Sequence, residues 1–318
     1  MIVVLTGGSG GAKFVDGLRR VVPPEDLTII VNTGDDHDWW GLHVSPDLDS
    51  ITYVLAGMLS AERGWGVRGD TFYCLQAMKE LGEPFWFSVG DRDLATHVLR
   101  TKLLSQGRTL TEATEIIAQR LNLSSRILPM TNMRVETRVD TPSGEFSFEE
   151  YFVQRWYQDP VNGVSFAGAS ASRPAPGVLE AIAGAQAVLL APSNPVTSIG
   201  PILAVPGIRD ALAKTSAPVV AVSPIIGHAA VLGPAANLMA AQHLDVSVSG
   251  VAEAYGGFLD VLIAHDSDAD AAQMLSNDHL QIRCTNILMR TAEDKSRLAQ
   301  FALELAIPRA ASSAAEAE

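Results

Sequence analysis

The chain has 318 residues, of which 47% are hydrophobic, and a formal net charge of −13 at pH 7. Binding of a polyanion requires an excess of basic residues, so no nucleic-acid partner is expected. No apolar segment is long enough to cross a bilayer and Met1 opens a strand-like run, so we expect a soluble cytoplasmic protein without a membrane partner. Cys74 and Cys284 lack the spacing of a metal site or disulfide framework and are expected to be buried thiols.

The beginning of the chain predicts an anion-binding turn. Residues 1–5 form an apolar run, and residues 6–13 (TGGSGGAK) lead from it into a helical pattern. Glycines let backbone N–H groups approach a phosphate, and the helix dipole adds about half a positive charge there. A Walker loop needs a glycine before the lysine and a serine or threonine after it, which this turn lacks. A dinucleotide fingerprint needs a third glycine where Lys13 stands. The turn therefore predicts phosphate binding and disfavours a nicotinamide-dependent oxidoreductase.

Strand and helix signals alternate along much of the chain. Further strand candidates lie at residues 27–31, 187–190, 218–222, 258–264 and around 285–288. This alternation predicts an α/β fold with a doubly wound, mostly parallel Rossmann-like sheet. We assign residues 1–51 and 166–308 to this nucleotide-binding core.

Residues 52–165 follow a different pattern. Amphipathic helices are predicted at 71–81, 95–105 and 110–121, and short alternating strands near 134–139. We expect a helix-rich inserted domain that covers the active site at the carboxyl edge of the sheet. Residues 309–318 are small, polar and acidic, which predicts a disordered tail.

Carboxylates are concentrated after the second strand candidate. They are Asp35, Asp36, Asp38, Asp47 and Asp49. Grouped opposite a phosphate-binding turn, carboxylates suit Mg²⁺, which takes one or two of them together with water and phosphate oxygens. For each aspartate taken alone, helix capping or turn formation is the alternative role. We predict Asp35 and Asp36 as the metal ligands.

Tryptophans occur in the same polar region. Trp39 and Trp40 are adjacent, and Trp65 follows a little later. Such residues either plug a seam between domains or stack on a flat ligand, and the sequence leaves both open.

A charged helix is predicted to begin near residue 91, with Asp91 as its cap. Its residues Asp93, His97 and Arg100 share one face, which is typical of a salt-bridged surface stripe. Arg92 lies at the helix start, from which its guanidinium could bind a carboxylate, phosphate or ring carbonyl.

The loop after the strand candidate at 187–190 contains Ser193 and Asn194. Its hydroxyls and amide favour equally a second phosphate or nucleotide contact and simple capping of the next helix.

Nine blocks of sequence occur together in a fixed order. They are residues 6–13, 32–36, 46–49, 66 with 70–72, 90–97, 127–130, 192–201, 222–227 and 250–253. With these blocks the chain resembles the 2-phospho-L-lactate transferase family (CofD/FbiA type) of coenzyme F420 biosynthesis. The likeness spans essentially the whole chain.

The resemblance implies a Mg²⁺-dependent transferase. Its members move a 2-phospholactyl or phosphoenolpyruvyl group from a GDP-linked donor to the ribityl hydroxyl of the deazaflavin Fo (7,8-didemethyl-8-hydroxy-5-deazariboflavin). The products are (dehydro)coenzyme F420-0 and GMP, and a homodimer is usual. Relatives that bind nucleotides or nucleotide sugars as regulatory proteins provide the alternative function. The sequence leaves open whether the transferred acid is lactate, enolpyruvate or glycerate.

The resemblance also assigns roles to residues of this chain. Asp49 and Arg92 are expected to bind Fo, and Asp49 and Asp36 to be catalytic residues. The donor nucleotide and its phosphates are expected to bind Gly8, Gly10, Gly11, Lys13, Ser193 and Asn194.

Overall fold

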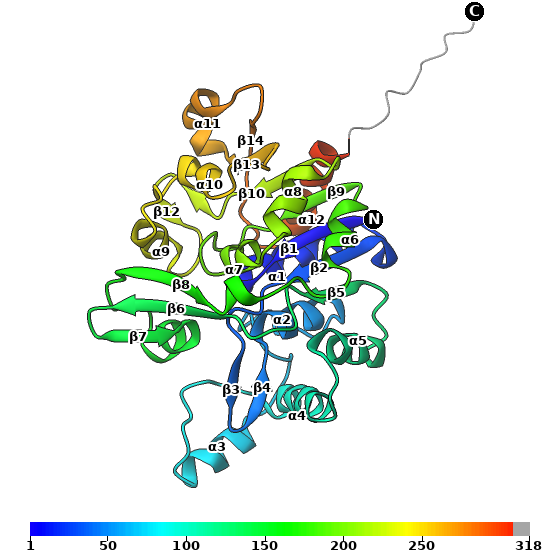
Figure 1. The fold of residues 1–318 in the computed structure, drawn as a ribbon, viewed down its shortest axis with the longest axis vertical. Helices are drawn as coiled ribbons and strands as arrows, with labels where there is room; N and C mark the ends of the chain where they lie inside the picture. Colours follow the sequence, from blue (N-terminus) through cyan, green and yellow to red (C-terminus); the bar gives the residue numbers. More distant parts are fainter. Residues whose placement is uncertain (308–318) are drawn as a thin grey trace, which may run out of the picture.

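The apolar runs form a seven-stranded parallel sheet in the computed structural model, which describes residues 1–307. All six pairings between neighbouring strands are parallel. The predicted α/β fold with a doubly wound parallel sheet is confirmed (Figure 1). In sheet order the strands are β14 (Gln281–Thr285), β13 (Val261–His265), β10 (Val219–Val222), β9 (Ala187–Leu190), β1 (Ile2–Thr6), β2 (Leu27–Val31) and β5 (Arg126–Pro129).

The sheet separates two hydrophobic cores, because successive side chains of a strand point to opposite faces. In β1, Val3 and Leu5 enter one core, whereas Ile2 and Val4 enter the other. The first core contains side chains of α6 (Val178–Ala183), α7 (Gly200–Ala204), α8 (Ile208–Lys214), α9 (Ala235–Ala241), α10 (Val248–Ala254) and α11 (Ala269–Leu275). The second contains side chains of α1 (Gly8–Leu18), α2 (Pro46–Leu55), α5 (Leu110–Arg120) and α12 (Ala292–Ala306).

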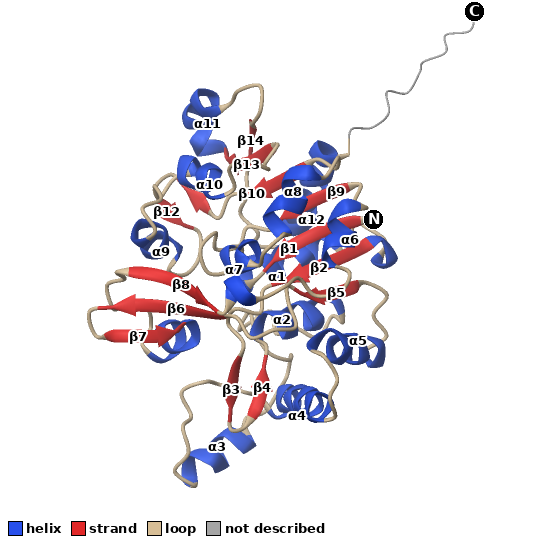
Figure 2. Cartoon of the chain, in the orientation of Figure 1, coloured by secondary structure: helices blue, strands red, loops and turns tan. Residues whose placement is uncertain are grey.

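The remaining elements extend from the carboxyl edge of the sheet (Figure 2). A hairpin of β3 (His37–Trp39) and β4 (Leu42–Val44) lies near α3 (Tyr73–Glu80) and α4 (Asp91–Ser105). A separate antiparallel sheet has the order β7-β6-β8, formed by β6 (Glu136–Thr141), β7 (Gly144–Ser147) and β8 (Gly163–Ala167). A short pair joins β11 (Ile225–Ile226) to β12 (Ala229–Ala230).

Residues 52–165 do not form one continuous insertion. Within this stretch, β5 pairs in parallel with β2 and is the edge strand of the central sheet. The chain therefore leaves the core, returns to it at residue 126, and leaves again for the three-stranded sheet. The predicted boundaries 1–51 and 166–308 omit this strand.

Several local predictions differ from the structure. The last strand is Gln281–Thr285, earlier than predicted, because the Asn286 side chain accepts the N–H of Leu288 at 3.0 Å and forms a turn. Cys74 and Cys284 are partly exposed, since they lie on a helix with no buried residue and on an edge strand. The predicted tail at 309–318 lies outside the described residues. Across residues 1–307, no helix combines the length and the apolarity that crossing a bilayer requires.

Candidate functional site

The order of the sheet reverses beside β1. The chain passes from β1 to β2 on one side, while β9 lies on the other side. Ligands of open parallel sheets bind at the carboxyl ends of the strands beside such a reversal. The loops after all three strands meet there: Ser193 Oγ donates to Gly7 O at 2.7 Å, and Asn32 Nδ2 donates to Thr197 O at 3.3 Å. This meeting point is the candidate site.

The predicted glycine turn begins helix α1 as expected. Gly7 is the N-cap residue with extended backbone, and Gly8 has a φ of +65°, a conformation that favours glycine. A Cβ at Gly10 would overlap the carbonyl oxygen of Pro192, and one at Gly11 would overlap the hydroxyl of Thr6. Contacts within the chain therefore require these two glycines, independently of any phosphate.

An internal carboxylate lies at the N-terminus of α1. Gly8 N–H donates to Asp47 Oδ1 at 2.6 Å, and Asn32 Nδ2 donates to Asp47 Oδ2 at 3.0 Å. Asp47 reaches this position from the first turn of α2, which begins at Pro46. A helix start leaves backbone amides free, and its dipole favours a negative charge. The turn thus binds an anion, and one of its amides already binds Asp47.

Buried acidic residues surround this point. Asp35, Asp47 and Glu149 are each 7% exposed. Burial, together with the charges of nearby Asp47 and Asp36, raises the pKa of Glu149 to about 8. Burial also raises the pKa of Asp47 to about 6. For Asp35, burial and then the charges of Asp47 and Glu149 raise the pKa well above its ordinary value. The cluster therefore resists carrying its full negative charge unless a cation is present.

Two oxygens of this cluster have no partner. Within the described residues, Asp35 Oδ1 and Asp36 Oδ1 are buried and have no donor in good hydrogen-bonding geometry, although the nearby Thr137 hydroxyl lowers the pKa of Asp35. The other oxygen of each is used, since Asp35 Oδ2 accepts from Asn32 at 2.9 Å and Asp36 Oδ2 accepts from Ser45 at 2.7 Å. Buried carboxylate oxygens without donors are suitable ligands for a hard divalent cation. The predicted ligands Asp35 and Asp36 thus have the chemistry that Mg²⁺ requires.

Glu149 is the acidic residue that the sequence analysis missed. It immediately precedes a short π-helix, Glu150–Gln154, which follows β7. Such helices are rare and often occur near functional sites, but they have no reliable sequence signal. Only the three-stranded sheet brings Glu149 close to Asp47.

The remaining predicted donor-binding residues differ in their surroundings. Asn194 Oδ1 accepts the N–H groups of Val196 at 2.9 Å and Thr197 at 3.4 Å, which forms a side-chain turn. Lys13 is partly buried, and this burial together with the charge of Lys295 on α12 lowers its pKa. The turn explains why Asn194 occurs here, and donor binding by Asn194 and Lys13 stays a prediction.

Asp49 forms a buried ion pair. Arg100 Nη1 donates to Asp49 Oδ2 at 3.0 Å, and Arg100 Nη2 donates to Asp49 Oδ1. Arg92, the other residue expected to bind Fo, is exposed and donates to the carbonyl oxygen of Arg68 at 3.3 Å. The structure therefore pairs Asp49 with Arg100 and leaves the Arg92 guanidinium at the surface.

The charged face of α4 is buried, so its prediction as a surface stripe is wrong. Asp93, His97 and Arg100 are at most 8% exposed, because this face packs toward α2. Tyr53 on α2 donates to Asp93 Oδ1 at 2.6 Å. His97 lies between two carboxylates, with Nδ1 3.5 Å from Asp49 Oδ2 and Nε2 3.6 Å from Asp93 Oδ1. Polar partners replace solvent over most of this face, but among the described residues His97 Nε2 and Arg100 Nε are buried without a hydrogen-bond partner.

The titration of this network follows from its burial. Burial raises the pKa of Asp93 to about 7, helped by the charge of Asp49, and burial lowers the pKa of His97 to about 4. His97 is therefore neutral at pH 7. One ligand atom from each of Asp49, Asp93 and His97 lies within 4.8 Å of the others. The guanidinium of Arg100 already neutralises Asp49, which makes this trio a poorer cation site than the acids around Asp35.

The cap of α4 also differs from the prediction. Asp91 is the first helical residue, and its carboxylate accepts the N–H groups of Tyr73 and Cys74 at the start of α3. Asp70 instead accepts the N–H groups of Arg92 at 2.8 Å and Asp93 at 3.0 Å. Asp91 thus caps α3, and Asp70 caps α4.

The tryptophans take different environments. Trp39 is buried with Val44 and Val89, and its ring packs edge-on to that of Trp86 at 4.9 Å between centroids. Trp65 is 39% exposed. Trp39 therefore fills the core beneath the β3–β4 hairpin, whereas stacking of Trp65 on a ligand stays open.

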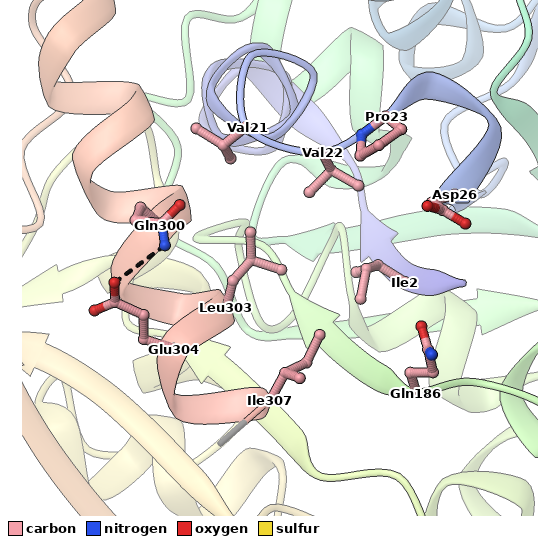
Figure 3. Close-up of a pocket in the computed structure, with 10 residues that line it drawn as sticks. All are labelled: Ile2, Val21, Val22, Pro23, Asp26, Gln186, Gln300, Leu303, Glu304 and Ile307. Carbon is pink, nitrogen blue, oxygen red and sulfur yellow. Dashed lines mark hydrogen bonds between the residues drawn. The ribbon is translucent and has the colours of Figure 1, made fainter. Parts of the chain in front are cut away.

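A cavity of about 310 Å³ lies elsewhere on the molecule (Figure 3). It is lined by residues of the first β-strand, the end of α12 and the segment after α1, among them Ile2, Val22, Leu303 and Ile307. Ile2 begins β1, so the cavity lies at the amino edge of the sheet, away from the site at the carboxyl edge.

The raised pKa of Glu149 predicts how stability depends on pH. A carboxyl whose folded-state pKa is raised stabilises the protein fully below its ordinary pKa of 4.5, and this contribution is lost as the pH rises through about 8. In EDTA, Tm should therefore fall more steeply between pH 5 and pH 8 in the wild type than in Glu149→Gln. Thermal unfolding of both proteins at matched pH measures the difference. Parallel curves would contradict the prediction.

Sequence and structure comparisons yield three kinds of match. The family model described as 2-phospho-L-lactate transferase CofD matches residues 2–298. The phosphoenolpyruvate transferase of Streptomyces coelicolor is 43% identical over 311 residues, covering 96% of this chain and 98% of the relative. The 2-phospho-L-lactate transferase of Methanothermobacter thermautotrophicus is 42% identical over 303 residues, covering 95% and 97%.

A solved structure supports the fold alone. The crystal structure of a UPF0052-family protein from Bacillus halodurans has a TM-score of 0.63 at 16% identity, covering 95% of this chain and 98% of the other.

Proposed function

The chain belongs to the 2-phospho-L-lactate transferase CofD family, and from this membership we propose that it transfers a 2-phospholactyl or phosphoenolpyruvyl group to the deazaflavin Fo. The donor is the GDP-linked form of the phospho-acid, and GMP is released. One structural observation carries the proposal: the N-terminus of α1 meets buried carboxylates at the sheet reversal. Phosphoryl transfer requires this combination of anion binding and charge neutralisation.

Magnesium is part of the proposal. Asp35 and Asp36, each with one buried oxygen that accepts no hydrogen bond from residues 1–307, would hold the ion, with Asp47 and Glu149 nearby. When bound, Mg²⁺ supplies positive charge that offsets the charge of the donor phosphates.

The chain's own residues bind and orient the two substrates. The free amides at the start of α1 bind the donor phosphates, and the loop with Ser193 and Asn194 closes the other side. The acceptor hydroxyl oxygen forms a bond to the phosphorus that carries the acid, and the bond from this phosphorus to the GMP oxygen breaks. Asp49 orients the hydroxyl, and its proton passes to Asp36, whose Oδ2 would take it while Oδ1 holds the ion, the Ser45 hydroxyl turning from donor to acceptor.

The identity of the acid requires an experiment. The relatives named for phosphoenolpyruvate and for 2-phospho-L-lactate are 43% and 42% identical to this chain, so identity does not choose between them. The acids differ only by a few atoms in one small pocket. We further propose that the enzyme acts in the cytoplasm as a homodimer.

The proposal predicts GMP release that depends on Fo. Purified protein should convert Fo with one of the candidate donors to the corresponding F420-0 species, detected by mass spectrometry, with equimolar GMP detected by chromatography. Asp49→Ala should lower the rate by at least about 100-fold, because an oriented contact to the reacting hydroxyl is lost. Binding of GDP without turnover on any donor would instead favour a nucleotide-binding regulatory protein.

A further inference from the structure

Helix α4 places an arginine in the interior, close to the candidate site. The side chain of Arg100 is 2% exposed, and that of its partner Asp49 is 6% exposed. Removing a guanidinium and a carboxylate from water is costly, and the attraction between them offsets this cost only when the geometry is good. Here each of the two terminal nitrogens of the guanidinium donates to a different oxygen of the carboxylate. The pair therefore holds the Asp49 carboxylate in one orientation.

Neighbouring contacts hold the two helices together around this pair. Tyr53 OH donates to Asp93 and also lies 2.8 Å from Thr96 Oγ1, which connects the last turn of α2 with the first two turns of α4. The neutral ring of His97 fills the space between the carboxylates. These contacts fix α2 and α4 relative to each other, so they also restrict the movement of Arg100.

The pair lies beside the donor site. Asp49 is two residues from Asp47, and both belong to the first turn of α2. Asp47 binds the Gly8 amide at the anion-binding turn, whereas Asp49 points toward α4. Residues two apart on a helix do not face the same way. The first turn of α2 therefore directs one carboxylate toward the anion-binding turn and the other toward α4.

We propose that Arg100 is a positioning residue, which holds the Asp49 carboxylate so that its remaining lone pairs accept a hydrogen bond from the acceptor hydroxyl. This inference rests on the proposed function. A buried ion pair is often no more stabilising than apolar residues of the same volume, so stability alone does not account for it. Because Arg100 binds both oxygens, Asp49 orients the hydroxyl rather than taking its proton.

The test compares Arg100→Met and Arg100→Lys with the wild type. Arg155→Met is the control, since Arg155 also makes a two-pronged ion pair, with Asp159, but near the surface, where its side chain is 32% exposed. Arg100→Met should raise the KM for Fo by about tenfold or more, as expected for losing an oriented charge-assisted contact. GDP affinity, measured by calorimetry, should change less than twofold. Arg100→Lys should recover part of the loss.

A double mutant separates positioning from a purely structural role. In an Asp49→Asn background, Arg100→Met should raise the KM for Fo little further, because a neutral amide already replaces the carboxylate that Arg100 orients. Additive effects, or an unchanged KM for Fo in a folded Arg100→Met protein, would overturn the inference. If Arg100→Met does not fold, Arg100→Lys decides: a wild-type KM overturns the inference, and a raised KM with normal GDP affinity supports it. If the wild type releases no GMP with Fo, the proposed function is wrong, and the inference that rests on it is wrong as well.

Discussion

Replacing Gly10 with valine is expected to destabilise the fold by about 3 kcal/mol or more. The Cβ would overlap the carbonyl oxygen of Pro192, a backbone atom that cannot move away by changing a rotamer. The contact joins the start of α1 to the loop after β9, so strain there separates elements of the central sheet. Urea unfolding of the two purified proteins measures the loss.

Gly163→Ala is the control for this substitution. A Cβ at Gly163 would meet nothing within 4 Å, and its backbone is not left-handed, so the change should cost less than about 0.5 kcal/mol. Wild-type stability of Gly10→Val combined with lost GDP affinity would show that the glycine serves the ligand alone. The sequence pattern predicted phosphate approach at this position, and the structure adds a packing requirement that acts before any ligand binds.

Removal of divalent cations should reduce transfer activity by at least about 100-fold, and Mg²⁺ or Mn²⁺ should restore it. The reason is the charge at the site: an anionic donor must approach the buried acids Asp35, Asp47 and Glu149. Turnover in EDTA and after readdition of metal, followed by GMP release, measures the effect. Full turnover in chelator would exclude the proposed metal requirement.

Two substitutions in one loop locate the ion. Asp35→Asn should raise the Mg²⁺ concentration needed for half-maximal activity, because it removes charge from a buried oxygen that lacks a partner in the described structure. Asp38→Asn is the control, since Asp38 is exposed and pairs with Arg134 at 3.1 Å. Equal metal dependence of the two variants would place the ion elsewhere.

The strands of the central sheet were predictable because they are buried on both faces. Runs such as those of β1, β2 and β9 are therefore almost entirely apolar, and each ends at a polar or glycine-rich loop. The edge strand β5 was missed as part of the core. It is short, begins with the exposed Arg126 and lies between segments of another pattern.

The candidate site was only partly predictable, for physical reasons. The glycine turn and the Asp35–Asp36 loop follow strands, and the carboxyl ends of parallel strands meet at one edge. The burial of Arg100 and His97 could not be read from helical spacing, because a charged face looks the same in sequence whether water or a second polar face covers it. Glu149 depends on a contact between the segment after β7 and the start of α2, for which local sequence carries no signal.

The position of β1 has a consequence for synthesis on the ribosome. β1 pairs with β2 on one side, but its other neighbour is β9, where Ile2 lies opposite Ala187. In a nascent chain that has not yet reached β9, one edge of the apolar strand β1 lacks its partner, and such edges are prone to intermolecular pairing. The site, which also needs Thr197, can assemble only after that point. Strand β1 therefore completes its pairing only when segments from both halves of the chain are present.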